Sequence, residues 1–118
     1  LNYGHTLAHA IERANDYTWR HGDAVAVGCC FAARLAQARG LLSADDVARH
    51  DQLFSRVGLP TRYEGSTLDE LTHIMLSDKK VRRGILRFVL LDGIANPGTV
   101  SVDPQELPAP ASQIGIRA

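Results

Sequence analysis

Three of the five histidines in this 118-residue chain lie close together near its start. His5 and His9 are four residues apart, which on a helix places both imidazoles on one face, one turn from each other. His21 follows a break in the helical pattern, so a short loop can return it against His5. Imidazole nitrogens are ligands for zinc and other divalent cations. The spacing therefore predicts half of a metal site.

The same histidine pair also fits an ordinary helix face. A catalytic zinc site uses three protein ligands, and only two are obvious here. The zincin pattern HExxH is absent, because no glutamate follows His5 directly. On spacing alone, both the metal site and the plain helix stay open.

Composition indicates a globular chain without a charged macromolecular partner. The formal net charge is zero and 45% of the residues are hydrophobic, which allows a core and gives no sign of nucleic-acid or anionic-membrane binding. No apolar run is long enough to span a bilayer. Cys29 and Cys30 are neighbours whose side chains diverge on a helix, so we interpret them as small buried residues of a reducing cytoplasm.

The elements that position the histidines are predicted from apolar spacing. The run AVAVGCCFAARLAQA (24–38) is apolar nearly all round, which predicts a central, buried helix. Gly28 within it indicates a close crossing with another helix. The chain is expected to be mainly α, with helices at 2–14, 22–39, 43–57 and 67–77 and one small β-hairpin formed by 87–91 and 99–102.

The later helices carry recognisable start signals. Ser43 is expected to cap the third helix, and Thr67 with Glu70 forms a possible capping box for the fourth. His50 is interpreted as a boundary residue between apolar and charged positions, and His73 is expected to face outward. The apolar stripe of the third helix is predicted to be Val47, Leu53, Phe54 and Val57.

The end of the chain reads differently from the rest. Residues 104–118 contain Pro104, Pro108 and Pro110, which exclude a regular helix throughout. We therefore divide the chain into a helical domain, 1–103, and a Pro-rich, mobile tail, 104–118.

Three sequence blocks together resemble one family. They are LNYGHTLAHAIE (1–12), HGDAVAVG (21–28) and DKKVRRGILRFVLLDGIANPG (78–98), in that order. These blocks are similar to the C-terminal, metal-binding helical domain of 3-dehydroquinate synthase, a sugar-phosphate cyclase. Asp23 departs from the pattern, because the family usually has glutamate there. A shorter carboxylate is expected to weaken a contact behind the metal ligand.

The resemblance implies a lyase of the shikimate pathway, which leads to chorismate and the aromatic amino acids. Its reaction converts 3-deoxy-D-arabino-heptulosonate 7-phosphate to 3-dehydroquinate with loss of phosphate. Zn²⁺ or Co²⁺ and NAD are the implied cofactors, and the implied location is the cytoplasm.

The resemblance also assigns roles to particular residues. His5 and His21 match two metal ligands, and the third ligand, a glutamate, lies upstream in the family. His9 matches a histidine that contacts substrate and transfers protons. The substrate-binding residues implied by the match are Asn2 and one of Lys79 and Lys80, between which the alignment does not choose.

The chain is expected to be a fragment of a longer enzyme. No G-x-G-x-x-G turn occurs in it, and the family binds NAD mainly through an N-terminal domain. That domain and the sugar phosphate are the expected partners, and the full-length enzyme is expected to be a homo-oligomer. The isolated fragment is expected to be inactive.

Three alternatives remain open. Another sugar-phosphate cyclase, such as a cyclitol synthase, would share the same histidines. A non-catalytic helical fragment would retain only a structural or interaction role. A zinc-dependent polyol dehydrogenase fits less well, because the GHTxxHA and DKK motifs argue against it.

Overall fold

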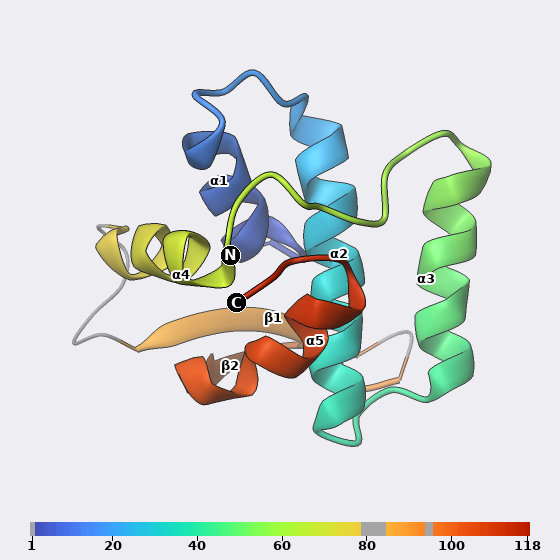
Figure 1. The fold of residues 1–118 in the computed structure, drawn as a ribbon. Helices are drawn as coiled ribbons and strands as arrows, with labels where there is room; N and C mark the ends of the chain where they lie inside the picture. The colour runs from blue at the N-terminus through green and yellow to red at the C-terminus, as the bar shows by residue number, and fades with distance from the viewer. Residues whose placement is uncertain (1, 79–84, 94–95) are drawn as a thin grey trace.

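The chain folds around one long helix, α2 (His21–Ala38), which contacts α1, α3, α5 and β1 (Figure 1). The computed structural model describes residues 2–78, 85–93 and 96–118. Helices α1 and α4 pack together on one side of α2, and α3 lies along the other side. The other elements are α1 (His5–Ala14), α3 (Ala44–Arg56), α4 (Leu68–Ser77), β1 (Leu86–Leu91), β2 (Pro97–Val102), the 3-10 helix η1 (Pro104–Glu106) and α5 (Pro108–Gln113).

The central position of α2 follows from its sequence, as predicted. Its residues are buried almost all round, including Val27, Phe31 and Leu35. A Cβ atom on Gly28 would overlap the carbonyl oxygen of Gly4, so only glycine lets the start of α1 rest on α2. The close approach of Gly4 and Gly28 brings the start of α1 against α2.

Cys29 and Cys30 of α2 are both free and buried.

Local capping signals set the starts of α3 and α4, which confirms both predictions. The Ser43 hydroxyl accepts a hydrogen bond from the backbone N–H of Asp46 at 3.1 Å. The Thr67 hydroxyl accepts one from the N–H of Glu70 at 3.2 Å. Both starts are capping boxes, in which the side-chain carboxylate of Asp46 or Glu70 accepts a hydrogen bond from the backbone N–H of the N-cap residue. Two backbone N–H groups that lack a helical partner are therefore satisfied at each helix start.

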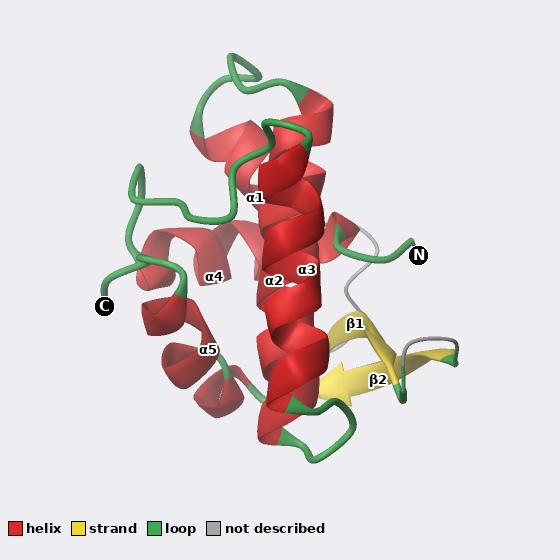
Figure 2. Cartoon of the chain, turned by 90° about the vertical axis from the view of Figure 1, so that its right-hand side faces the viewer, coloured by secondary structure: helices red, strands yellow, loops and turns green. Residues whose placement is uncertain are grey.

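The predicted β-hairpin is present and covers the lower part of α2 (Figure 2). Strands β1 and β2 pair antiparallel, with Leu86 opposite Val102 and Leu91 opposite Pro97. Phe88 packs on Phe31 of α2 with ring centroids 5.7 Å apart. The mainly α fold with one hairpin is therefore confirmed.

The apolar stripe predicted for α3 is only partly buried. Leu53 and Val57 are 63% and 67% exposed, whereas Val47 is buried. His50, predicted to be a boundary residue, is buried as well. The reason is that α2 is the main packing partner of α3, so only a narrow face of α3 is covered.

Residues 104–118 differ from the expected mobile tail. They form η1 and α5 and place Leu107, Ile114 and Ile116 in the core. The N–H of Tyr63 donates to the carbonyl of Ile114 at 2.9 Å, which fastens this segment to the loop before α4. Proline starts both helices, where its missing N–H has no helical partner to lose. Within the described residues, no helix is long and apolar enough to cross a membrane.

Candidate functional site

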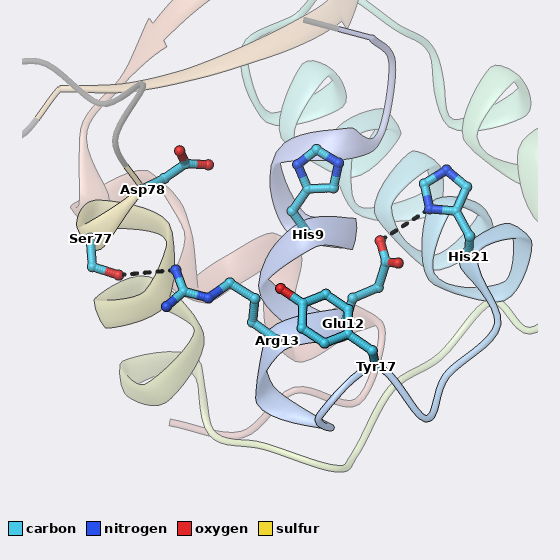
Figure 3. A pocket seen from close by; sticks show the side chains of 7 residues that line it. All are labelled: His9, Glu12, Arg13, Tyr17, His21, Ser77 and Asp78. Atoms are coloured by element: carbon cyan, nitrogen blue, oxygen red, sulfur yellow. Dashed lines mark hydrogen bonds and ion pairs between the residues drawn. The ribbon is translucent and has the colours of Figure 1, made fainter.

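Helix α1 presents a row of polar side chains to a cavity between α1, α2 and α4. His9 and Glu12 are three residues apart and Arg13 follows one turn after His9, so all three reach the same side of the helix. The volume of the cavity is about 700 Å³, and its walls are formed by His9, Glu12, Arg13, Tyr17, His21, Ser77 and Asp78 (Figure 3).

The loop after α1 returns His21 against His5, as the sequence predicted. The two imidazole centroids are 5.3 Å apart. His21 is the first residue of α2, and the Gly4–Gly28 contact holds the two helices close enough for this approach. His9 also packs against His5, with centroids 5.5 Å apart. The three histidines therefore form one cluster with His5 in the middle.

Two of these rings have one nitrogen occupied by a protein acceptor. Nδ1–H of His5 donates to the carbonyl of Tyr3 at 3.1 Å, since a carbonyl can only accept. Nδ1 of His21 lies 3.1 Å from the Glu12 carboxylate, which likewise accepts. Both contacts place the proton on Nδ1 and leave the Nε2 lone pair for a ligand.

The donor set fits a divalent metal that takes a further ligand from outside the described residues. With Zn–N distances of about 2.0–2.1 Å and tetrahedral geometry, two coordinating imidazoles have centroids about 5 Å apart. The His5–His21 distance agrees with this value. In the part of the chain that the structure describes, no three His, Cys, Asp or Glu groups gather as a complete metal site. His5 and His21 are therefore suited to be two of its ligands.

His9 differs from its two neighbours. Its ring is exposed and lines the cavity, and no protein group in the described ranges forms a hydrogen bond with it. Both ring nitrogens are therefore open to a bound molecule, as far as the described residues show. This is the environment expected of a group that exchanges protons with a bound molecule.

The remaining predicted site residues are Asn2, Lys79 and Lys80. Asn2 is exposed and does not line it. Lys79 and Lys80 lie outside the described residues, although Asp78, directly before them in sequence, forms part of the wall. His73 faces outward on α4, as predicted.

Glu12 is the functional candidate that sequence reasoning missed. The sequence predicted a carboxylate contact behind a metal ligand at Asp23, which instead lines a separate cavity with Trp19 and Pro60. The signal was present, because Glu12 follows His9 by three residues on the same helix face. Which carboxylate reaches His21 depends on how α1 crosses α2, and spacing within one helix does not report that.

Sequence comparison links the chain to one enzyme family. Residues 1–81 match the family model described as 3-dehydroquinate synthase C-terminal. A 3-dehydroquinate synthase from Mycolicibacterium gilvum is 50% identical over 115 residues, which are 97% of this chain and 32% of that protein. One from Mycobacterium leprae is 53% identical over 105 residues, 88% of this chain and 29% of that protein. The chain spans about a third of the length of these relatives.

Structural comparison finds related cyclases. A 2-deoxy-scyllo-inosose synthase complexed with carbaglucose-6-phosphate, NAD+ and Co2+ superposes with a TM-score of 0.81 at 30% identity, covering 94% of this chain and 32% of that one. A 2-epi-5-epi-valiolone synthase from Streptomyces hygroscopicus subsp. jinggangensis 5008, with NAD+ and Zn2+ bound, has a TM-score of 0.83 at 26% identity, covering 95% and 31%. From its motifs, its fold and these matches, the chain belongs to the 3-dehydroquinate synthase C-terminal family.

Proposed function

We propose that this chain is the metal- and substrate-binding part of a 3-dehydroquinate synthase. The intact enzyme would convert 3-deoxy-D-arabino-heptulosonate 7-phosphate to 3-dehydroquinate, with NAD and a divalent metal. The observation that supports this most directly is the pair His5 and His21, each with Nδ1 occupied and Nε2 open. It occurs in a chain about half identical to proteins of that name.

Each part of the reaction has a candidate residue. A bound metal would polarise hydroxyl and ketone oxygens and stabilise the negative charge that develops on them. His5 and His21 would hold it, and His9 would transfer protons at the substrate. Lys79 or Lys80 would bind an anionic group of the substrate, and Asn2 would donate amide hydrogen bonds to it.

NAD would be bound mainly by a region outside this chain. The related cyclases were solved with NAD+, and this chain matches about a third of their length. An upstream glutamate would complete the metal site. The cytoplasmic location and the homo-oligomeric state stay predictions.

The test is a pair of substitutions in the intact enzyme. His21→Ala should remove bound metal and activity together. His9→Ala should keep the metal while turnover falls by about 100-fold or more, which is the effect of losing a general acid–base group. His73→Ala is the matched control, because His73 is an exposed histidine away from the cavity. Full metal occupancy in His21→Ala, or metal loss in His9→Ala, would contradict the assignment.

A related cyclitol synthase is the second candidate, because the matched structures carry such names. These structures are 26–30% identical to the chain, whereas the 3-dehydroquinate synthases are about 50% identical. Product analysis with the intact enzyme separates the two. A cyclitol product from a sugar phosphate without a carboxylate would replace our proposal.

A third test concerns the chain alone. Residues 1–118 should release no phosphate from the substrate at any NAD concentration, because a catalytic metal site normally uses three protein ligands. Phosphate release by this chain with zinc and NAD supplied would contradict the proposal that NAD binds mainly elsewhere.

A further inference from the structure

The Glu12–His21 contact joins two helices, and only its Glu12 side is sheltered from solvent. The Glu12 side chain is 14% exposed, whereas that of His21 is 59% exposed. Among the described residues, His21 is the only side-chain partner of this carboxylate. A carboxylate that is mostly buried needs such a partner, because burial without one is unfavourable. The contact is therefore part of how α1 and α2 fit together.

We propose that Glu12 is a positioning residue, whose carboxylate accepts Nδ1–H of His21 from α1 and so presents Nε2 of that ring to the metal. The inference rests on the proposed function of His21 as a ligand. The role of Glu12 itself is assigned from the 3.1 Å contact and its burial. A carboxylate that accepts a hydrogen bond from a metal-binding histidine fixes the orientation of the ring, selects its tautomer and makes the other ring nitrogen a stronger metal ligand.

The geometry argues against Glu12 as a metal ligand itself. Its Oε1 atom lies at Nδ1 of His21, whereas the nitrogen left for the metal is Nε2 on the other side of the ring. A carboxylate behind the ring in this way cannot share an ion with Nε2 unless it breaks the contact. The described residues also contain no group of three that could hold a metal ion.

The two candidate ligands are held by unequal partners. His5 donates to a backbone carbonyl, which no substitution of a side chain removes directly. His21 donates to a carboxylate, which carries negative charge and can be replaced. A substitution of Glu12 can therefore change the orientation of His21 while both candidate ligands, His5 and His21, stay in the sequence.

The first test measures the His21 tautomer without any metal. The intact enzyme, stripped of metal, can be labelled with 15N-histidine and examined at about pH 8, above the ordinary histidine pKa of about 6.5. Spectra that correlate ring nitrogens with ring protons should show the His21 proton on Nδ1. In Glu12→Ala, that proton should shift at least in part to Nε2. In Glu12→Gln, whose amide oxygen can still accept, it should stay on Nδ1.

The second test measures metal affinity in the intact enzyme by competition with a chelator. Glu12→Ala should weaken zinc binding by about 10- to 100-fold, the usual effect of removing such a partner. Glu12→Gln should weaken it less, because it keeps the hydrogen bond and loses only the charge. Glu64→Gln is the matched control, since the Glu64 side chain is exposed and its carboxylate forms only a long ion pair, at 3.9 Å, with Arg62.

The outcomes separate this inference from the proposed function. Unchanged zinc affinity in both Glu12 variants of an active enzyme, or a wild-type His21 proton on Nε2, would overturn the inference. A lower melting temperature with unchanged affinity and tautomer would show that Glu12 only joins the helices, and would overturn it too. An intact wild-type enzyme that binds no metal would instead defeat the proposed function, while the tautomer measurement still decides what Glu12 does.

Discussion

The chain contains two histidine environments that share one residue, Tyr3. In the histidine cluster beside the cavity, His5 and His21 each have Nδ1 occupied and Nε2 open. Beside α3, His50 is buried and both of its nitrogens are occupied: Nδ1–H donates to the Asp46 carbonyl at 2.8 Å, and the Tyr3 hydroxyl donates to Nε2 at 2.9 Å. A histidine with both nitrogens occupied by protein is structural, and one with an open nitrogen is available for chemistry.

Tyr3 connects the two environments through different atoms. Its backbone carbonyl accepts from His5, and its side chain donates to His50. Burial, together with the neighbouring Cys29 and Cys30, raises the pKa of the Tyr3 phenol, so the hydroxyl stays protonated and remains a donor. Burial likewise raises the pKa of Cys29 to about 11, which keeps that thiol protonated and unreactive at neutral pH.

The largest expected effect comes from deleting one histidine of each kind in the intact enzyme. His5→Ala should remove bound metal and activity, while changing the free energy of unfolding, measured for both proteins without metal, by no more than about 1 kcal/mol. His50→Ala should lower that free energy by about 2 kcal/mol, because it leaves a cavity and removes the nearer hydrogen-bond partner of the Tyr3 hydroxyl, and should keep the metal. Metal analysis and urea denaturation check both. Metal loss in His50→Ala would remove the distinction between the two environments.

The next largest effect should come from the helix crossing beneath the cavity. Gly28→Ala would push its Cβ into the Gly4 carbonyl, so α1 must move away from α2. The free energy of unfolding should fall by about 3 kcal/mol or more, since overpacking a tight contact is destabilising. Gly22→Ala is the control, because no atom lies near a Cβ at that position. Equal urea midpoints for the two variants would show that the crossing is not tight.

A smaller effect is expected at the ion pair that holds α3, the helix of His50, against α2. Arg34 donates two hydrogen bonds to the Asp51 carboxylate, at 2.9 and 2.6 Å. Asp51→Asn should lower the free energy of unfolding by about 2 kcal/mol, as expected for hydrogen bonds to a charged group. Asp16→Asn is a suitable control, because Asp16 is exposed and asparagine tolerates its positive φ.

The same pair predicts an acid-dependent loss of stability. Burial opposes ionisation of Asp51, but the hydrogen bonds from Arg34 outweigh it and lower the pKa of the carboxyl. A lowered folded pKa contributes stability above the unfolded value of about 3.9, and that contribution is lost as the pH falls through the folded pKa. Urea denaturation from pH 7 down to about pH 3 should show this loss in the wild type, and it should be smaller in Asp51→Asn.

The smallest expected effect sharpens the comparison at Tyr3 itself. Tyr3→Phe removes the hydroxyl donor to His50 and keeps the backbone carbonyl that accepts from His5. The free energy of unfolding should fall by about 1 kcal/mol, and metal affinity should not change. Zinc affinity can be measured by competition with a chelator. If Tyr3→Phe also weakened zinc binding, the Tyr3 side chain would couple the two histidine environments.

Much of the fold could be predicted from local sequence signals. Ser43 and Thr67 predict helix starts, because each hydroxyl accepts a hydrogen bond from the backbone N–H of the residue three positions later. The apolar run in α2 predicts burial because a helix without a polar face has no side to expose. In contrast, the burial of His50, the exposure of Leu53 and the packing of Ile116 depend on contacts with distant segments.

The candidate site divides in the same way. The sequence by itself determined that His5 and His9 share a helix face and that His21 can return to them, because helical rise and a short loop set those distances. Only the tertiary structure decided which nitrogen each ring leaves open and that Glu12, not Asp23, lies behind His21. Those features depend on where α1 crosses α2, and that crossing is set by the contact between Gly4 and Gly28, twenty-four residues apart in the chain.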